Sequence, residues 1–158
     1  MERKTKALLM TALCALLLFT AACGQEKAQH ADLQAVYDEI AKLPGQPEMM
    51  PLSAKKLSSY YGIDATACPQ VIAMICADGL RMDEIWMIEA ESEEQAEQIL
   101  TVAKSHIDQL CSETENYLPD QYAVAKQARA LRIGSSAALF ISPEAETMEE
   151  LFRQGFRD

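Results

Sequence analysis

The chain has 158 residues, of which 49% are hydrophobic, and its 14 Lys and Arg residues stand against 24 Asp and Glu, a formal net charge of −10. That length suits a single domain, and the apolar fraction excludes a chain that is disordered throughout. A nucleic-acid binder needs a basic surface, so we expect no nucleic-acid partner for so acidic a chain.

The first 22 residues have the features of an export signal. Residues 2–6 carry three positive charges, residues 7–22 form an apolar run, and small residues close that run. As a helix the run would span about 24 Å, which is short for a hydrocarbon core of roughly 30 Å. The pattern therefore predicts a secretory signal that is removed.

The end of this signal resembles the cleavage site of bacterial lipoprotein precursors, where a Cys after small residues receives diacylglycerol and becomes the first residue. Ala21, Ala22 and Cys23 match that pattern, whereas Thr20 stands where an aliphatic residue is usual. The resemblance implies a signal peptide over residues 1–22 and lipid on Cys23. Cleavage without lipidation and an uncleaved membrane helix are the alternatives.

Lipidation would hold the protein at the extracytoplasmic face of the cell membrane. Residues 23–31 would be the lipidated Cys and a short tether, and residues 32–158 a single exported domain. Loss of residues 1–22 removes three basic residues and one acidic residue, which leaves a net charge of −12. Anionic headgroups repel so acidic a surface, so we expect the lipid alone to contact the membrane.

The exported domain is predicted to contain four helices and four strands. Asp32, Ser53 and Ser92 have the character of N-caps, and Ser92 with Gln95 forms a capping box. The expected elements are helices from Asp32 to Pro44 and from Ser53 to Gly62, strands over 71–77 and 85–88, a helix over 93–111, a loop over 116–120, strands over 128–133 and 137–141, and a last helix after Ser142-Pro143.

The order is thus helix, helix, strand, strand, helix, strand, strand, helix. Two hairpins with helices between them predict an α+β domain: an antiparallel sheet of about four strands, with the helices packed on one face. In the second helix we expect Leu57, Tyr60 and Tyr61 to point inward.

Several short motifs resemble a family of small lipoproteins from Gram-positive anaerobes whose exported domain is one of unknown function. The matching stretches are Pro47-Glu48-Met49-Met50, Tyr61-Gly62-Ile63-Asp64, Asp83-Glu84-Ile85, Tyr117-Leu118-Pro119-Asp120-Gln121-Tyr122 and Ile141-Ser142-Pro143. The resemblance covers residues 32–155. It implies no activity and supplies no catalytic residue.

Cysteine and histidine offer little chemistry. Cys68, Cys76 and Cys111 remain besides Cys23, and an odd count favours free, buried thiols over one disulfide to Cys111 or a reactive thiol. There are only two histidines: His30 lies in the tether, and His106 is expected to be exposed on the long helix. We therefore predict no metal site, no cofactor and no catalytic residue.

An acidic run surrounds the start of that helix, and we interpret it as charge that suits a helix N-terminus rather than a cation site. It consists of Glu89, Glu91, Glu93, Glu94 and Glu97.

Two groups of side chains could form a contact surface. The first is Met49 and Met50 with Tyr60 and Tyr61, and the second is the loop with Tyr117 and Tyr122. Met and Tyr make adaptable binding surfaces, but packing in the core is the competing interpretation for both groups.

The function that the sequence favours is a non-catalytic, lipid-anchored module that binds a protein or a small ligand near the membrane. A structural or envelope accessory without a specific ligand is the alternative. An envelope enzyme is the least favoured of the three classes, because no catalytic constellation is visible.

Overall fold

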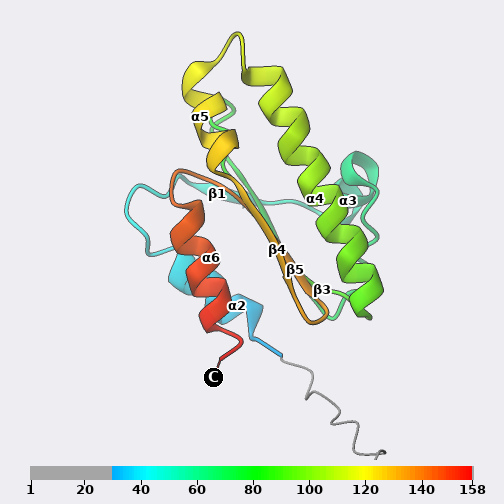
Figure 1. The fold of residues 1–158 in the computed structure, drawn as a ribbon. Coiled ribbons are helices and arrows are strands. Elements are labelled where there is room, and N and C mark those ends of the chain that lie inside the picture. Colours follow the sequence, from blue (N-terminus) through cyan, green and yellow to red (C-terminus); the bar gives the residue numbers. More distant parts are fainter. Residues whose placement is uncertain (1–29, 158) are drawn as a thin grey trace, which may run out of the picture.

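A five-stranded antiparallel sheet runs through the centre of the protein, with helices on both sides (Figure 1). The computed structural model describes residues 30–157. The predicted signal peptide, the predicted lipidation site Cys23 and most of the predicted tether lie outside the described residues.

The described elements follow the predicted order with two additions. They are α2 (Leu33–Ile40), β1 (Met49–Pro51), α3 (Ala54–Tyr61), β2 (Gln70–Cys76), β3 (Glu84–Glu89), α4 (Glu93–Thr114), α5 (Pro119–Gln127), β4 (Arg129–Ile133), β5 (Ser136–Ile141) and α6 (Ala145–Gln154). The four expected strands and four expected helices are all present. Strand β1 and helix α5 are additional, which makes five strands.

Helices α2, α3 and α4 begin where their capping residues predicted, whereas α6 begins at Ala145, after a Glu144 that makes no side-chain cap hydrogen bond. The Asp32 carboxylate accepts hydrogen bonds from the N–H groups of Gln34 and Ala35. The Ser92 hydroxyl accepts from the N–H of Gln95, and the Gln95 side chain accepts from the N–H of Glu91. Each such cap contributes about 1 kcal/mol, because it satisfies backbone donors that the helix leaves free.

Helix α5 begins within the segment predicted as a loop. Pro119 stands in its first turn, where the missing N–H costs nothing, so this Pro opens a helix instead of excluding one. The loop is thereby reduced to the few residues between Thr114 and Pro119.

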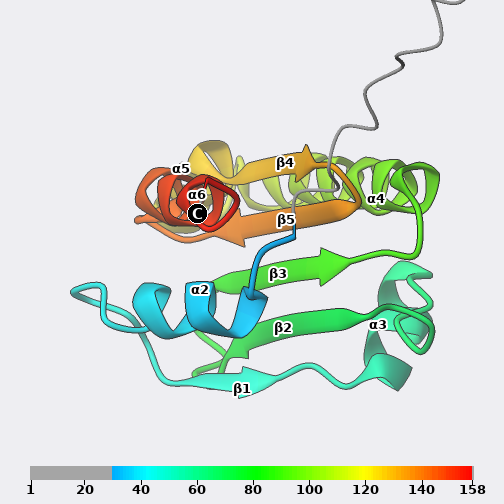
Figure 2. The same ribbon diagram turned by 90° about the horizontal axis from the view of Figure 1, so that it is seen from below.

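The strands lie in the order β1-β2-β3-β5-β4, and each neighbouring pair is antiparallel (Figure 2). Strand β3 is central, and its Trp86 pairs with Ala73 of β2 and with Leu139 of β5. The two predicted hairpins are therefore confirmed, and they join through the β3–β5 pairing.

The expectation that helices pack on one face was wrong. Trp86 and Ile88 of β3 point to the face covered by α3, α4 and α5, whereas Ile85 and Met87 point to the face covered by α2 and α6. Every residue of β3 and β5 is buried. A strand that is apolar at successive positions requires a cover on both faces, since neighbouring side chains alternate between them.

The cover on the two faces differs in composition. Aromatic rings dominate the α6 side, where Phe152 packs edge-on against Phe140 and Phe156. Small residues of α4, such as Ala96 and Ala103, lie against the other face, where Trp86 supplies the bulk. Within residues 30–157 no helix is both long and apolar enough to cross a bilayer.

Candidate functional site

Strand β3 begins and ends with a buried glutamate, Glu84 and Glu89, and each is paired with one of the chain's two histidines. Burial of a carboxylate is costly unless charged or polar partners compensate it. The two ends of β3 are therefore the first places to examine for chemistry.

At the first end, the Glu84 carboxylate accepts three hydrogen bonds. Tyr61 Oη–H and Trp86 Nε1–H donate to Oε1, at 2.9 and 2.7 Å, and His106 Nε2 lies 2.9 Å from Oε2. We call Tyr61, Glu84, Trp86 and His106 the Glu84 cluster. Desolvation, followed by the negative charge of Glu84, raises the pKa of Tyr61, so that Tyr61 keeps its proton and remains a donor.

The prediction that His106 is exposed was wrong, because its side chain is only 14% exposed. The ring stacks parallel to Trp86, with centroids 5.7 Å apart, and meets Tyr61 edge-on at 5.0 Å. The sequence contained a signal for this position: His106 follows Ala103 by three residues and precedes Leu110 by four, so it continues the buried stripe of α4.

A cavity of about 270 Å³ adjoins the Glu84 cluster between the β2–β3 turn and α4. Cys76 and His106 both line it. However, Ile75 pairs with Glu84, and Cys76, which pairs with Met49, is the next residue along β2. Successive side chains of a strand alternate between its two faces, so the Cys76 side chain points to the face opposite Glu84. Both Glu84 oxygens are already occupied by donors, so the arrangement acts as a clamp between β3, α3 and α4.

At the other end, Glu89 Oε1 lies 2.5 Å from His30 Nδ1, and Gln70 Nε2–H donates to Glu89 Oε2 at 2.6 Å. Gln70 also holds the chain next to His30, since it donates to the carbonyl of Ala31 and accepts from the N–H of Leu33. His30, which the sequence assigned to the tether, therefore contacts the domain. Its side chain is 66% exposed.

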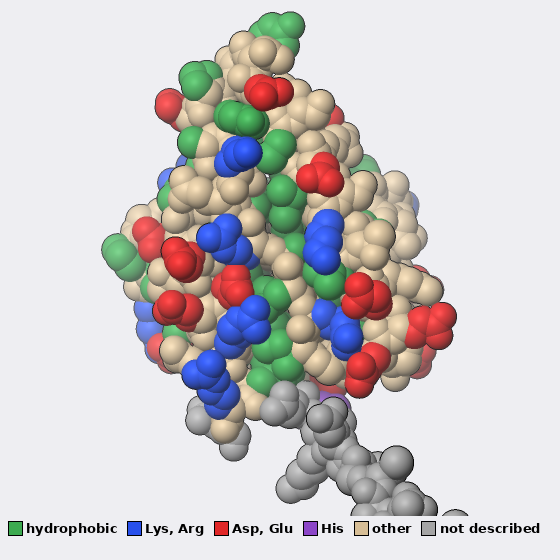
Figure 3. All heavy atoms as spheres, in the orientation of Figure 1, with side chains coloured by type: hydrophobic (Ala, Val, Ile, Leu, Met, Phe, Trp, Pro, Cys, Tyr) green, Lys and Arg blue, Asp and Glu red, His purple; other side chains and the backbone are tan. Residues whose placement is uncertain are grey.

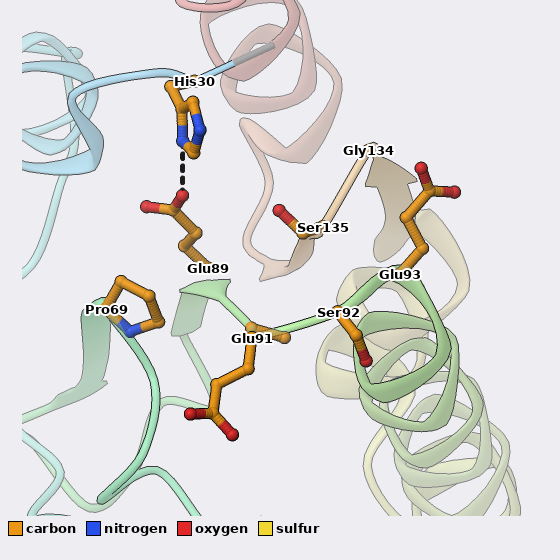
Figure 4. A pocket seen from close by; sticks show the side chains of 9 residues that line it. His30, Pro69, Glu89, Glu91, Ser92, Glu93, Gly134 and Ser135 are labelled. Atoms are coloured by element: carbon orange, nitrogen blue, oxygen red, sulfur yellow. Dashed lines mark hydrogen bonds and ion pairs between the residues drawn. The ribbon is translucent and has the colours of Figure 1, made fainter. Parts of the chain in front are cut away.

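A cavity of about 370 Å³ opens beside this pair (Figure 4). The Ser135 side chain borders it, while the Glu91 and Glu93 carboxylates point away from Glu89 and from each other. The acidic run thus does not converge on one point. Glu93 and Glu97 instead pair with Arg132 of β4, at 3.1 and 3.0 Å.

Neither metal-binding side chains nor thiols are grouped into a cluster among the described residues. Within residues 30–157, no three His, Cys, Asp or Glu side chains are grouped so that they could hold a metal ion. Cys68, Cys76 and Cys111 are free and half-buried, which is less burial than predicted. Partial burial, followed by the charges of Asp64 and Glu91, raises the pKa of the Cys68 thiol.

The first predicted contact group is divided between different parts of the fold. Met49 packs into the core on the α2 side, Tyr61 belongs to the Glu84 cluster, and Met50 lies exposed on the edge strand β1. Tyr60 was expected to point inward but is 68% exposed. These four side chains do not line a common cavity among the described pockets.

The second predicted group is better placed for contact. Tyr117, between α4 and α5, is 83% exposed, and its neighbour Leu118 is 46% exposed. Tyr122 is half-buried, with its hydroxyl 3.4 Å from Glu115 Oε1. Leu80 in the β2–β3 turn, which the sequence analysis missed, is 80% exposed.

Leu80 belongs to the same region as Tyr117, because the Gln121 amide in the first turn of α5 donates to the carbonyl oxygen of Leu80 at 3.0 Å. We call Leu80, Tyr117 and Leu118 the tip. Hydrophobic side chains are visible in Figure 3 over the loop between α4 and α5, at the top of the view. Single exposed apolar residues are ordinary, whereas three large ones on two joined loops make the tip a candidate interaction site.

Residues 41–142 match DUF4358, a domain of unknown function, and the chain belongs to this family. The matched region contains the whole sheet, the Glu84 cluster and the tip, whereas His30, α2 and α6 lie outside it. No curated protein and no solved structure matches the chain.

Proposed function

We propose that the protein is a lipid-anchored, extracytoplasmic binding module that engages a protein partner through the tip. The observation that carries this proposal is the joint exposure of Leu80, Tyr117 and Leu118 on two loops that a hydrogen bond connects. Tyr is enriched at the centres of protein interfaces, where its ring is buried and its hydroxyl finds a partner.

The position of the tip supports an anchored binder. His30 and Glu93 line the same cavity at the start of α4, whereas Tyr117 follows the end of α4 by three residues. The 22 residues of α4 span about 33 Å, so this distance separates the tip from the end that the lipid on Cys23 would hold. The tip lies at one end of the domain and the chain enters at the other (Figure 1).

The test is site-specific photo-crosslinking in cells of the source organism. A photoreactive phenylalanine analogue replaces Tyr117 in the full lipidated chain, and the matched control carries it at Tyr60, another exposed tyrosine. We expect an adduct with one other protein from position 117 and none from position 60. That protein, once identified and purified, should bind the wild-type domain, and Leu80→Ser should weaken the binding about tenfold.

If position 60 gives the same adduct as position 117, or if Leu80→Ser binds normally, the tip is not the binding site. The anchor is tested separately with Cys23→Ala. Mass spectrometry of the wild type should find a chain that begins at Cys23 and carries a lipid mass that the variant lacks, and a wild-type chain without that mass would remove the lipoprotein proposal.

A second candidate is an envelope hydrolase, which the His30–Glu89 pair favours. Glu89 binds His30 Nδ1, so the other ring nitrogen is available as a base beside the cavity that Ser135 borders. It ranks second because, among the described residues, no hydrogen bond joins the Ser135 hydroxyl to His30. A fluorophosphonate probe should label the wild type but not Ser135→Ala if this candidate is correct, and absence of labelling would remove it.

A further inference from the structure

We infer that the partner of the tip presents an apolar segment flanked by Lys or Arg residues. This inference rests on the proposed function, because it assigns the chemistry of the partner at the same tip. It is carried by the charges that surround Leu80, Tyr117 and Leu118.

The rim of the tip is acidic. Its carboxylates come from the β2–β3 turn, the end of α4 and the start of α5, and all are exposed: Asp78, Glu113, Glu115 and Asp120. No Lys or Arg occurs between Lys104 and Lys126, a stretch that contains the whole loop from α4 to α5. Four like charges around an apolar centre favour a partner of the opposite charge.

The nearest cations are already engaged within the domain. Arg81, next to Leu80, donates two hydrogen bonds to the buried Asp83 carboxylate, at 2.8 and 2.9 Å. Lys126 Nζ lies 5.8 Å from the centre of the Tyr122 ring. The Asp83 carboxylate compensates the charge of Arg81, so Lys126 alone opposes the four rim carboxylates and the rim keeps a net negative charge.

The same charges argue against other occupants. A symmetric contact with a second copy would oppose two acidic rims, and like charges across an interface are unfavourable. An anionic membrane surface would repel the rim as well. A basic protein segment satisfies both the apolar centre and the rim.

The tip is also ordered before binding. The Asp78 carboxylate accepts from the N–H of Leu80 at 3.0 Å, and Gln121 binds the Leu80 carbonyl oxygen on the other side. Tyr117 and Leu118 both donate backbone N–H groups to the carbonyl oxygen of Thr114. A preformed surface loses less conformational entropy when it binds.

The experiment repeats the photo-crosslinking at position 117 in variants whose rim carboxylates are replaced by neutral side chains. The neutral-tip variant has three isosteric changes in the full lipidated chain: Glu113→Gln, Glu115→Gln and Asp120→Asn. The matched control removes three exposed charges from α4's first turn and from α6: Glu94→Gln, Glu146→Gln and Glu150→Gln. Both variants change the net charge equally.

We expect the yield of the adduct to fall about five- to tenfold in the neutral-tip variant and to stay within about twofold in the control. In isolated membranes, an increase from about 0.1 to about 0.5 M NaCl should lower the yield for the wild type and have little effect on the neutral-tip variant. Sequencing of the crosslinked peptide by mass spectrometry should show Lys or Arg next to the partner residues that carry the crosslink.

The outcomes separate this inference from the function on which it rests. If an adduct forms but its yield changes neither in the neutral-tip variant nor with salt, the proposed binding function stands and the inference of a basic partner is wrong. An adduct between two copies of the chain, or with lipid, also overturns the inference. Absence of any adduct at position 117 overturns the proposed function together with the inference.

Discussion

The two ends of β3 use the same pair of residue types in different surroundings. At the first end, Glu84 and His106 are enclosed by Tyr61 and Trp86, and three donors converge on one carboxylate. At the other end, Glu89 is equally buried, but its partner His30 is mostly exposed beside an open cavity. A glutamate–histidine contact is therefore a structural clamp in one place and a water-accessible pair in the other.

The difference has a physical origin. Water competes weakly for the Glu84 cluster, so loss of one partner leaves buried donors without acceptors. Water can replace His30 at Glu89, because the imidazole reaches the carboxylate from the surface. The two ends should therefore respond differently to the same substitution.

The largest effect is expected from the glutamates themselves. Glu84→Ala should lower the free energy of unfolding of the protein by about 3–5 kcal/mol, because Tyr61, Trp86 and His106 lose their shared acceptor in a buried site. Glu89→Ala should cost about 1–2 kcal/mol. Denaturant titration measures both, and equal losses at the two ends would contradict the comparison.

The next effect concerns the histidines. His106→Ala should cost about 2–3 kcal/mol, since it removes a ring packed between Trp86 and Tyr61 and a hydrogen bond to Glu84. His30→Ala should cost about 0.5 kcal/mol, as expected for an exposed partner. A larger loss from His30→Ala would show that the chain before α2 is essential to the fold.

Alkaline pH sharpens the comparison further. The pKa of Tyr61 is higher in the folded protein than its ordinary value of 10.0, so the unfolded state releases this proton first as the pH rises. The stability that Tyr61 contributes is fully present below pH 10 and is lost as the pH rises through the folded pKa. Tyr61→Phe should flatten the decline of stability above pH 10, as followed by thermal melts at stepped pH.

The matched control is Tyr60→Phe, since Tyr60 is exposed and its hydroxyl does not bind Glu84. This variant should retain the alkaline decline of the wild type. If both variants behave alike, another group is responsible for the decline.

The smallest effect is expected from the thiols. Thiol counting in denaturant should find Cys68, Cys76 and Cys111 reactive with or without reductant, because all three are free. Alkylation of Cys68 in the native protein at neutral pH should be slower than that of a thiol in a short peptide, since its raised pKa reduces the thiolate fraction. A count of one free thiol without reductant would reveal a disulfide.

Local sequence signals predicted most of the secondary structure. The Asp32, Ser53 and Ser92 caps place the starts of α2, α3 and α4, because a cap acts on backbone groups only two or three residues away. The strand patterns were equally local. The apolar residues on both faces of β3 and β5 require a helical layer on each face of the sheet, as the structure shows.

The candidate sites were predicted less well. The loop with Tyr117 was among the predicted contact groups, but its apolar neighbour Leu80 lies 37 positions earlier in the chain and carries no signal of its own. The prediction for His106 was wrong because the residue was taken to lie off the apolar stripe of α4. Its helical spacing placed it with Ala103 and Leu110, where the buried Glu84 compensates its polarity.

The sequence by itself determined most of the elements, the caps of α2, α3 and α4, the order of the predicted elements and the acidic charge of the chain. The tertiary structure alone decided which distant residues meet: His30 with Glu89, Glu84 with both Tyr61 and His106, and the Leu80 turn with the start of α5. Caps and strand patterns depend on neighbours in the chain, whereas these contacts depend on sheet order, pairing register and the face on which each helix packs. Those features arise only when the whole core is buried at once.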